Sequence, residues 1–284
     1  MGKKIKKNKK IFIKDKQKFL ISVLINCYNA EETIKKTILS ALNQTYKKIE
    51  LIIVDDASTD NTVNIIKNFR NNKIRLFQNK KHLGLGSSRI LAQKLIKGKY
   101  VAVLDADDVW EKNKIFEQYK ILNKNRRIAF VSTWFKIIDE KNKTVSYENK
   151  IASNKNIIDY ICEKNIFAHS SIIYKKDLAK KYGWYSKNLE YSQDFDLTIK
   201  FLKKNDFFLI KKFLTKIRVS DLNMSYDKKY LYIRSKEKII LLKKIRKNFR
   251  LNFINKVKNL KSIIYEYIKL TLVYIFFGNK FKNI

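Results

Sequence analysis

The feature that most constrains this chain is an apolar run that ends in three carboxylates. Residues Tyr100–Leu104 (YVAVL) have the length and the composition of a buried strand at the centre of a sheet. Asp105, Asp107 and Asp108 follow it directly. Carboxylates packed this closely repel one another, and a bound divalent cation relieves that repulsion; Asp oxygens suit Mg²⁺ or Mn²⁺. The stretch therefore predicts a metal site at a strand end, and the alternative is an acidic turn without a ligand.

Further apolar runs alternate with helical stretches along the first half of the chain. We expect strands at Phe19–Cys27, Ile49–Val54, Ile74–Gln78, Tyr100–Leu104 and Ile128–Phe135. The alternation predicts an α/β fold with a Rossmann-like, doubly wound and mostly parallel sheet, which has its ligand sites at the carboxyl ends of the strands. Tyr28, Asp56 and Asp107 each stand just after one of these strands, so we expect them to converge.

The second half of the chain is less regular until its C-terminal region. Within residues 140–182 we expect a strand at Phe167–Tyr174 and a short helix at Lys175–Tyr182. A further helix is expected at Ser192–Lys203, and in the first half a helix is expected to open at Arg89, after a glycine-containing loop.

The charge of the chain is concentrated at its two ends. The formal net charge is +37, and residues 1–18 and 228–284 together carry more than half of it. Apolar residues between 242 and 275 recur at steps of three and four, with Lys and Arg on the other face, which is helical periodicity. We therefore divide the chain into a basic tail (1–18), an α/β domain (19–227) and a basic amphipathic helical extension (228–284).

Composition restricts the partners and the compartment. A charge this large suggests nucleic acid or an anionic membrane, although the absence of proline and the many Lys, Asn and Ile residues indicate that codon bias accounts for part of it. Cys27 and Cys162 are far apart in sequence and lack metal-ligand spacing, which fits a reduced, cytoplasmic compartment. We expect neither a secretion signal nor a transmembrane span, because the N-terminus is polar and no clean run of eighteen apolar residues occurs.

Five ordered motifs give a resemblance to a known family. They read SVLINCYNAEETIKKTILSALNQTY, ELIIVDDASTDNT, HLGLGSSR, LDADD and SQDFDL, within a match that runs from about Phe19 to Ser225. In this order and spacing they resemble the family 2 glycosyltransferases with the GT-A fold, a large inverting group that builds surface polysaccharides and glycolipids. The resemblance implies a nucleotide-diphospho-sugar transferase fold and a divalent cation at the acidic motif.

The resemblance implies roles for five residues on the donor side. Tyr28 is similar to the residue that stacks on the nucleotide base, and Asp56 to the carboxylate that accepts a hydrogen bond from a uracil or thymine ring nitrogen. Arg89 matches a basic residue that reaches the nucleotide. Asp105 resembles the ribose-side member of the metal motif, and Asp107 the metal ligand itself.

The resemblance also implies an acceptor side. Asp194 stands where the family keeps its general base, and we expect it in the first turn of its helix, where the helix dipole favours a carboxylate. We expect Asp196 to be structural and paired with a Lys or Arg. His169 and Gln193 are candidate acceptor contacts; Gln193 replaces a Glu that often precedes the base.

The residues themselves leave alternatives open. Tyr28 as a core aromatic and Asp56 as a helix cap are the structural alternatives, and helix capping is the alternative for Asp194. We expect Asp55 to hold the shape of its loop and His82 to be a surface loop residue. For His169, a satisfied core or edge histidine explains the residue as well as an acceptor contact does.

The predicted activity is transfer of a sugar from a UDP- or dTDP-sugar to a hydroxyl of a glycan or lipid-linked acceptor, with inversion and with Mn²⁺ or Mg²⁺ as cofactor. Two other functions are the alternatives: a sugar-phosphate nucleotidyltransferase, which releases pyrophosphate, and a non-catalytic nucleic-acid binder, which binds any duplex with steep salt dependence. No nucleic-acid partner is expected. Ser220 replaces a His that commonly follows the basic residue matched by Arg218, which leaves a metal or phosphate role for that late loop in doubt.

The C-terminal extension predicts a location. Its apolar stripe and its basic face are typical of helices that lie in a membrane interface, where each basic residue near an anionic leaflet contributes about 1 kcal/mol. We therefore expect residues 228–284 to hold the protein on the inner face of the cytoplasmic membrane. The alternative is that the stripe packs on the catalytic domain or forms a dimer.

Overall fold

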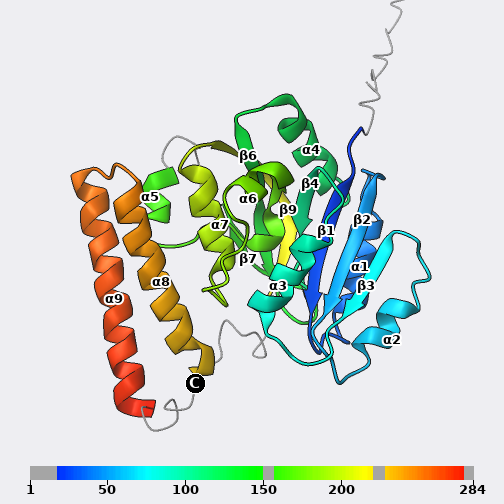
Figure 1. Ribbon diagram of the computed structural model, residues 1–284, viewed down its shortest axis with the longest axis horizontal. Coiled ribbons are helices and arrows are strands. Elements are labelled where there is room, and N and C mark those ends of the chain that lie inside the picture. The colour runs from blue at the N-terminus through cyan, green and yellow to red at the C-terminus, as the bar shows by residue number, and fades with distance from the viewer. Residues whose placement is uncertain (1–17, 150–156, 220–227, 278–284) are drawn as a thin grey trace, which may run out of the picture.

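The computed structural model describes residues 18–149, 157–219 and 228–277, and a sheet of nine strands lies at its centre (Figure 1). The strand order is β3-β2-β1-β4-β8-β6-β9-β5, with β7 paired to β6. The first four strands are β1 (Ile21–Cys27), β2 (Ile49–Asp55), β3 (Ile74–Gln78) and β4 (Tyr100–Val103). They pair in parallel, and every residue of β2 is buried, as expected of a strand that is covered on both faces.

The sheet becomes mixed beyond β4. The remaining strands are β5 (Val109–Trp110), β6 (Ile128–Ile138), β7 (Thr144–Glu148), β8 (Ile173–Lys175) and β9 (Asp206–Arg218). The short strand β8 runs antiparallel to both β4 and β6, whereas β6 and β9 are parallel. The predicted α/β fold and mostly parallel sheet are confirmed, with an antiparallel strand at the junction of the two halves.

Helices cover both faces of the sheet. They are α1 (Ile34–Leu42), α2 (Thr62–Lys67), α3 (Leu85–Lys94), α4 (Lys114–Lys124), α5 (Ile157–Ile161), α6 (Lys176–Lys181), α7 (Gln193–Leu202), α8 (Lys228–Asn248) and α9 (Phe253–Phe277). One apolar cluster joins the sheet to α1, α2 and α4. The other joins it to α3, α5, α6, α7, α8 and α9, so the fold is doubly wound as predicted.

The predicted strand Phe167–Tyr174 is wrong in its first half. A 3₁₀ turn occupies His169–Ser171, and only Ile173–Lys175 forms a strand. Serine hydroxyls explain the turn, because they offer the backbone partners outside a ladder. The Ser171 hydroxyl donates to the Ala168 carbonyl at 2.6 Å. His169 therefore lies in a turn and not in a strand.

Other boundaries differ for reasons of local chemistry. The thirteen-residue strand β9 was not expected, because the exposed Lys211 and Lys212 interrupt its apolar pattern. Helix α3 begins at Leu85, four residues before Arg89, directly after Gly84, whose φ of +86° turns the chain into the helix. Periodicity in the sequence does not locate the ends of helices and strands accurately, because the residues that start or stop an element number only one or two.

The described part of the C-terminal extension is helical, as predicted. Helices α8 and α9 form an antiparallel pair at the end of the molecule opposite α2 (Figure 1). Leu241, Leu242 and Ile245 of α8 are buried in the core that α7 and the sheet share. Among the described helices, none is long and apolar enough to cross a membrane.

A buried carboxylate fastens the amino ends of the parallel strands. The carboxylate of Glu50 on β2 accepts hydrogen bonds from the Ser22 hydroxyl at 2.6 Å, the Arg75 guanidinium at 2.7 Å and the Lys97 N–H at 3.0 Å. The N–H of Gly98 donates to the same Ser22 hydroxyl, and a Cβ at Gly98 would lie 2.6 Å from the Ser22 nitrogen. The turn into β4 therefore requires glycine.

We predict that Glu50→Gln lowers the free energy of unfolding by about 1–3 kcal/mol at neutral pH, because a charged acceptor of three donors is lost. Burial alone would raise the pKa of Glu50, but the bonds from Ser22, Arg75 and Lys97 hold it below its usual value. The stabilisation is therefore present above the unfolded-state pKa and is lost as the pH falls through the lower, folded-state pKa. Urea unfolding of both proteins across the acid range measures this, and their difference should vanish at the lowest pH.

The exposed Glu140 provides the control. Glu140→Gln should leave the unfolding curve unchanged at every pH. Equal stability of Glu50→Gln and the wild type at neutral pH would contradict the role given to this carboxylate.

Candidate active site

The carboxyl ends of β1, β2 and β4 meet at one edge of the sheet and bring the predicted residues together. The N–H of Asp56 donates to the Cys27 carbonyl at 2.8 Å, which joins the ends of β2 and β1. The hydroxyl of Thr37 on α1 donates to the carbonyls of Ala106 and Asp108, each at 2.9 Å, and so fixes the acidic loop after β4. The expected convergence of these three loops is thus confirmed.

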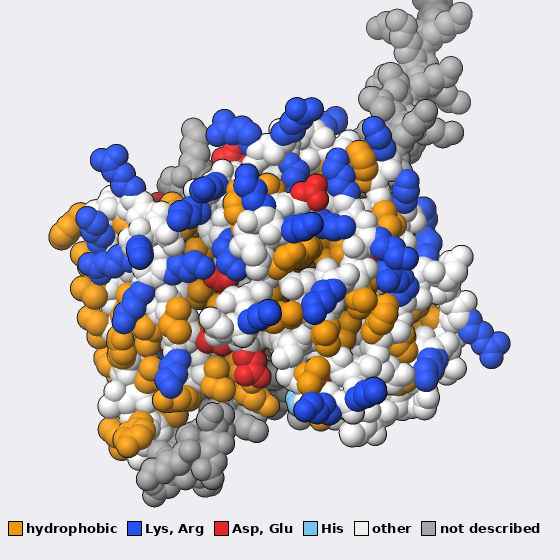
Figure 2. All heavy atoms as spheres, in the orientation of Figure 1, with side chains coloured by type: hydrophobic (Ala, Val, Ile, Leu, Met, Phe, Trp, Pro, Cys, Tyr) orange, Lys and Arg blue, Asp and Glu red, His pale blue; other side chains and the backbone are white. Residues whose placement is uncertain are grey.

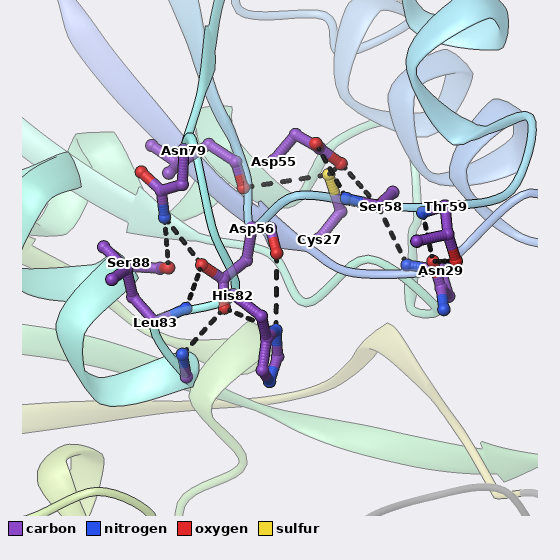
Figure 3. Close-up of polar contacts among 12 residues, drawn as sticks. Cys27, Asn29, Asp55, Asp56, Ser58, Thr59, Asn79, His82, Leu83 and Ser88 are labelled. Carbon is purple, nitrogen blue, oxygen red and sulfur yellow. Dashed lines mark hydrogen bonds and ion pairs between the residues drawn. The ribbon is translucent and has the colours of Figure 1, made fainter.

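Asp55 holds the first two loops in shape, as expected. It is fully buried, and its carboxylate accepts the N–H of Ser58 at 3.1 Å (Figure 3). The N–H of Asn29 in turn donates to the Ser58 hydroxyl at 2.9 Å, and the Asn29 side chain accepts the N–H of Thr59. Asn29 has a positive φ of 47°, so these bonds stabilise a strained turn beside Tyr28.

Asp56 organises the loop that follows β3. Its carboxylate accepts the N–H groups of Leu83 at 2.9 Å and Gly84 at 2.8 Å, and the side-chain amide of Asn79 at 2.6 Å (Figure 3). The Nδ1 atom of His82 lies 3.0 Å from the same carboxylate. Since Asp56 is 3% exposed and already accepts several donors, its contact with a nucleotide base stays a prediction.

Tyr28 and His82 form an aromatic surface at the mouth of this loop. Their ring centroids are 4.1 Å apart and the rings are tilted by 40°. Tyr28 is 45% exposed, which excludes the alternative that it is a core aromatic. His82 is a half-exposed loop residue, as expected, but it also belongs to the site, because it contacts both Tyr28 and Asp56.

The three carboxylates of the acidic loop have different surroundings. Asp108 is buried and accepts the N–H of Arg218 at 2.9 Å, so it is structural. Asp105 and Asp107 are partly exposed. Burial and the neighbouring Asp105 raise the pKa of Asp107 to about 6, against the opposing charge of Arg218.

Asp105 and Asp107 fit a divalent cation that is shared with a ligand. The described residues contain no group of three or more His, Cys, Asp or Glu side chains that could hold a metal ion alone. Mg²⁺ and Mn²⁺ commonly take one or two carboxylates from the protein and complete their shell with phosphate oxygens and water. A pair of partly exposed carboxylates, one with a raised pKa, is the donor set that such binding needs.

Arg218 locks the acidic loop to the end of β9. Its Nε donates to the Asp107 carbonyl at 2.9 Å, and its Nη1 donates to the Asp139 carbonyl at 2.6 Å. Its Nη2 donates to the Asn142 side chain at 2.6 Å. The guanidinium is therefore engaged by backbone and side-chain oxygens, and Ser220, two residues further on, lies outside the described residues.

Arg89 is a buried cation at the centre of the site. It is 6% exposed, its Nη2 lies 3.5 Å from Asp105 Oδ1, and its Nη1 is buried without a hydrogen-bond partner among the described residues. The Nδ1 atom of His169 lies 4.0 Å from the same Oδ1 of Asp105. Its Nε2 contacts the Tyr185 hydroxyl at 3.0 Å, and burial and the charge of Arg89 hold the pKa of His169 well below its usual range. His169 is thus a buried histidine bonded through Nε2 alone, because its Nδ1 has no hydrogen-bond partner among the described residues, and an acceptor contact stays a prediction.

Asp194 lies in the first turn of α7, as expected. The side-chain amide of Asn165 donates to its Oδ2 at 2.8 Å, and burial raises the pKa of Asp194 despite the opposing charge of Arg89. Asp196, by contrast, forms ion pairs with Lys200 at 2.7 Å and with Lys244, which confirms its structural role.

The loop before α7 is clamped by the C-terminal extension. The buried Glu237 of α8 accepts the N–H groups of Tyr191 at 3.1 Å and Ser192 at 2.8 Å, together with that of Glu190. These three residues lead directly to Asp194. A charge from α8 therefore fixes the start of the helix that carries the candidate base.

Gln193 does not face the acceptor side in this structure. It has no exposed surface, and its amide donates to the carbonyls of Ser186 at 2.8 Å and Gly86 at 3.4 Å. A Cβ at Gly86 would lie 3.1 Å from the Leu189 carbonyl, so a larger residue would fit only if this packing shifted. The structure gives Gln193 a role in joining two loops, because a side chain without exposed surface is not open to an acceptor.

A cavity of about 630 Å³ opens beside the candidate base. Asn165, which bonds to Asp194, lines it together with the aromatic residues Trp134 and Phe167. Lys258 of α9 and Glu163 also line it and form an ion pair at 3.4 Å. Apolar faces with polar groups at the rim suit a sugar ring or a similar amphipathic ligand.

A comparison with known families identifies the chain. The model of glycosyl transferase family 2 matches residues 22–183, which is more than half of the chain and includes the loops that carry Tyr28, Asp56 and the acidic motif. The chain belongs to glycosyl transferase family 2. It is therefore a glycosyltransferase, and neither the nucleotidyltransferase nor the nucleic-acid binder is needed to explain its sequence.

Curated relatives agree with this family. An uncharacterized glycosyltransferase of Methanocaldococcus jannaschii, MJ1057, is 32% identical over 206 residues, which cover 70% of this chain and 71% of the relative. WfaP of Escherichia coli, named as a UDP-Glc:alpha-D-GlcNAc-diphosphoundecaprenol beta-1,3-glucosyltransferase, is 40% identical over 116 residues. That match covers 41% of this chain and 46% of WfaP, so less than half of either protein is compared.

Solved structures show the same fold. TarS of S. aureus in complex with UDP-GlcNAc superposes with a TM-score of 0.68 at 20% identity and covers 89% of this chain and 74% of that chain. The mannosyltransferase PcManGT of Pyrobaculum calidifontis, in complex with GDP-Man and Mn²⁺, gives a TM-score of 0.62 at 14% identity, with 90% and 75% covered. The GT-A fold of this family 2 glycosyltransferase is thereby established.

Sequence reasoning missed four residues of this site. Asn165 and Tyr185 lie in irregular segments where no motif marks them. Glu237 lies in the extension, whose charge pattern gave no reason to connect it with α7. His82 begins the motif HLGLGSSR, and its place at the head of that loop was the one usable signal.

We predict that His169 stays neutral over the pH range in which an ordinary histidine titrates, because burial and Arg89 both oppose its protonation. The chain contains two histidines, so an NMR titration of the imidazole signals is simple to read. His82→Gln assigns the remaining signals to His169, and these should not shift across the range. A titration of His169 with a midpoint near its ordinary value would show that the pocket is open to water.

Proposed function

We propose that this glycosyltransferase moves a sugar from a UDP- or dTDP-sugar to a hydroxyl of a glycan or lipid-linked acceptor, with inversion at the anomeric carbon. The observation that carries the proposal is the meeting of the loops after β1, β2 and β4 at one edge of the sheet, where Tyr28 is exposed and Asp105 lies beside Asp107. Asp194 of α7 is close enough to Asp105 and Arg89 for their charges to act on its pKa. These groups suit, in turn, a nucleotide base, a diphosphate with its cation, and an acceptor hydroxyl. The UDP-Glc and diphosphoundecaprenol in the name of WfaP, and the UDP-GlcNAc bound to TarS, support the same chemistry here.

The donor nucleotide would lie on the surface of Tyr28 and His82. The exposed Tyr28 ring offers a face for the base, and His82 supports that ring from the side. Asp56, at the back of the loop, would accept a hydrogen bond from the base. Arg89 would reach the nucleotide through its unpartnered Nη1, since a buried guanidinium beside Asp105 is well placed for an anionic ligand.

Asp107, with Asp105 beside it, would hold Mn²⁺ or Mg²⁺ in this proposal. When bound, such a cation offsets the charge that develops on the departing diphosphate. The Mn²⁺ in the PcManGT complex supports the use of a divalent cation in this fold. Arg218 contributes by keeping the acidic loop in place through the Asp107 carbonyl.

Asp194 would act as the general base. Inversion requires a group that takes the proton from the acceptor hydroxyl on the side opposite the leaving diphosphate. The Asn165 amide donates to Oδ2 of Asp194, so we assign Oδ1 as the atom that accepts the proton of the acceptor hydroxyl. The raised pKa of Asp194 makes its carboxylate a stronger base than an ordinary Asp, while Arg89 limits that rise.

The cavity beside Asn165 is our candidate for the acceptor. Its aromatic wall, Trp134 and Phe167, suits the apolar face of a sugar, and Glu163 and Lys258 offer polar contacts at the side of α9. A lipid-linked acceptor would be met at a bilayer. We therefore infer that the protein works at the inner face of the cytoplasmic membrane, with an anionic membrane surface as its partner.

We predict that UDP- or dTDP-sugar turnover requires Mn²⁺ or Mg²⁺ and that Asp107→Asn lowers it roughly 10²-fold or more at unchanged stability, because a cation ligand is lost. Nucleotide release from a panel of donors, measured with each metal and with EDTA, tests this. Asp108→Asn is the comparison variant: its carboxylate is buried on the Arg218 N–H, so this variant should lower the melting temperature, which Asp107→Asn should not. Full turnover in EDTA would remove the metal from the proposal.

We predict that Asp194→Asn lowers sugar transfer by roughly 10² to 10⁴-fold, because the acceptor proton loses its base. Binding of UDP and of metal should be retained, and calorimetry measures both. Asp177→Asn is the matched control, since Asp177 lies in the first turn of α6 on the surface and tests helix capping alone. Transfer by Asp194→Asn within a factor of a few of the wild type would mean that the base lies elsewhere.

A further inference from the structure

Helix α9 buries polar residues on its inner face, beside the apolar Ile263 and Val273. The face that packs against the rest of the protein carries Asn255, Asn259 and Glu266, which are 3%, 0% and 2% exposed. Asn259 donates to the carbonyls of Cys162 and Leu242, and Asn255 donates to Asp159. A helix of a water-soluble domain ordinarily points such residues at solvent and its apolar residues at the core.

The outer face of α9 is apolar and open. We define it by six residues that recur at steps of three, four and seven: Phe253, Val257, Leu260, Ile264, Ile268 and Ile275. Their exposed fractions run from 37% at Val257 to 80% at Phe253. Figure 2 shows apolar side chains along this edge of the molecule, with Lys and Arg beside them. A contiguous apolar face of this kind marks an interaction surface.

The charges that α9 carries beside this face are positive, and two of them are already paired, Lys258 with Glu163 and Lys269 with Glu266. Lys256, Lys258, Lys261 and Lys269 are the ionic residues of α9 apart from Glu266, and Glu266 is buried against Ser235 and Lys238. Lysines that flank an apolar face can extend their ammonium groups to an anionic layer while their stems stay on the apolar side. Two copies of the face brought together would instead place these lysines near one another, which costs free energy.

We propose that the outer face of α9 docks in the interface of an anionic lipid bilayer. The helix has 25 residues and is thus about 37 Å long, which is enough for it to lie parallel to the bilayer surface within the interface. Its inner face is already fixed to α8 and α5 by Asn259, Asn255 and Glu266, so docking requires no rearrangement of the catalytic domain. The notable consequence is that α8 packs in the core and only α9 meets lipid.

Docking of this face would bring the candidate acceptor cavity close to the membrane. Lys258 lies on α9, beside the outer face, and also lines that cavity. A membrane-anchored acceptor could then enter the cavity from the lipid side. This last step rests on the proposed function, whereas the docking surface itself does not.

Vesicle flotation with the full chain tests the surface. We compare phosphatidylcholine vesicles with vesicles that also contain phosphatidylglycerol. The wild type should float with the anionic vesicles, and Leu260→Gln/Ile264→Gln/Ile268→Gln should lower its partition into them at least about tenfold, because three side chains no longer enter the interface. The basic N-terminal tail is present in both proteins, so its attraction to lipid cancels in the comparison.

Three controls make the result decisive. Val145→Gln/Tyr147→Gln removes two equally exposed apolar residues of β7 and should leave flotation unchanged. The single variant Ile264→Gln, checked by circular dichroism, guards against misfolding of the triple variant and should show a smaller loss in the same direction. Lys256→Gln/Lys261→Gln should reduce binding to anionic vesicles and make the remainder less sensitive to salt.

Flotation of the triple variant equal to the wild type would overturn the proposal, as would a wild type that binds neither vesicle. A solution dimer, detected by light scattering and broken by the triple variant without any vesicle binding, would assign the face to a second copy instead. Donor turnover in the absence of vesicles is measured in parallel. It reports on the transferase alone, so failure of the docking surface is separable from failure of the proposed reaction.

Discussion

The loop after β4 is the part of the molecule on which the rest of the site depends. Its carbonyls accept the hydroxyls of α1, its Asp108 accepts the N–H of Arg218 at the end of β9, and its Asp105 N–H donates to Ser170 in the 3₁₀ turn. Three carboxylates would repel one another if they were held together without such partners. Backbone N–H donors and nearby cations offset this repulsion. Because these partners come from both halves of the sheet, they also hold the two halves together at the loop.

Burial then separates the structural carboxylates from the two candidate site carboxylates. Asp55, Asp108 and Asp196 are almost fully enclosed, and each has donors or cations that satisfy it within the protein. Asp107 and Asp194 are partly exposed and have raised pKa values, from burial first and from Asp105 in addition. When burial destabilises the ionised form of a carboxylate that a ligand can still reach, binding of a cation or a proton relieves that cost.

The sequence predicted the first half of the fold well, because strands such as Tyr100–Val103 are continuous apolar runs and end in polar loops. It predicted the site at the level of loops, since parallel strands place their carboxyl ends together. The prediction failed where hydrogen bonds from side chains determine the backbone conformation. The serines after Ala168 form a turn instead of a strand. It could not foresee that Gln193 would be buried, because neighbours from distant loops cover it and periodicity carries no information about them.

The extension shows most clearly what a periodic pattern leaves undetermined. Apolar residues at steps of three and four define a stripe, but the stripe alone does not say whether the protein or the solvent lies on that side. Along α8 the stripe turns inward at Leu242 and Ile245, and along α9 it turns outward, because Asn259 and Glu266 find partners on α8 and hold the polar face inside. Glu237 and Lys244 of α8 also bind the segment around Asp194. The same helix pair therefore links an outward apolar face to the position of the candidate base, through bonds that are all buried or partly buried.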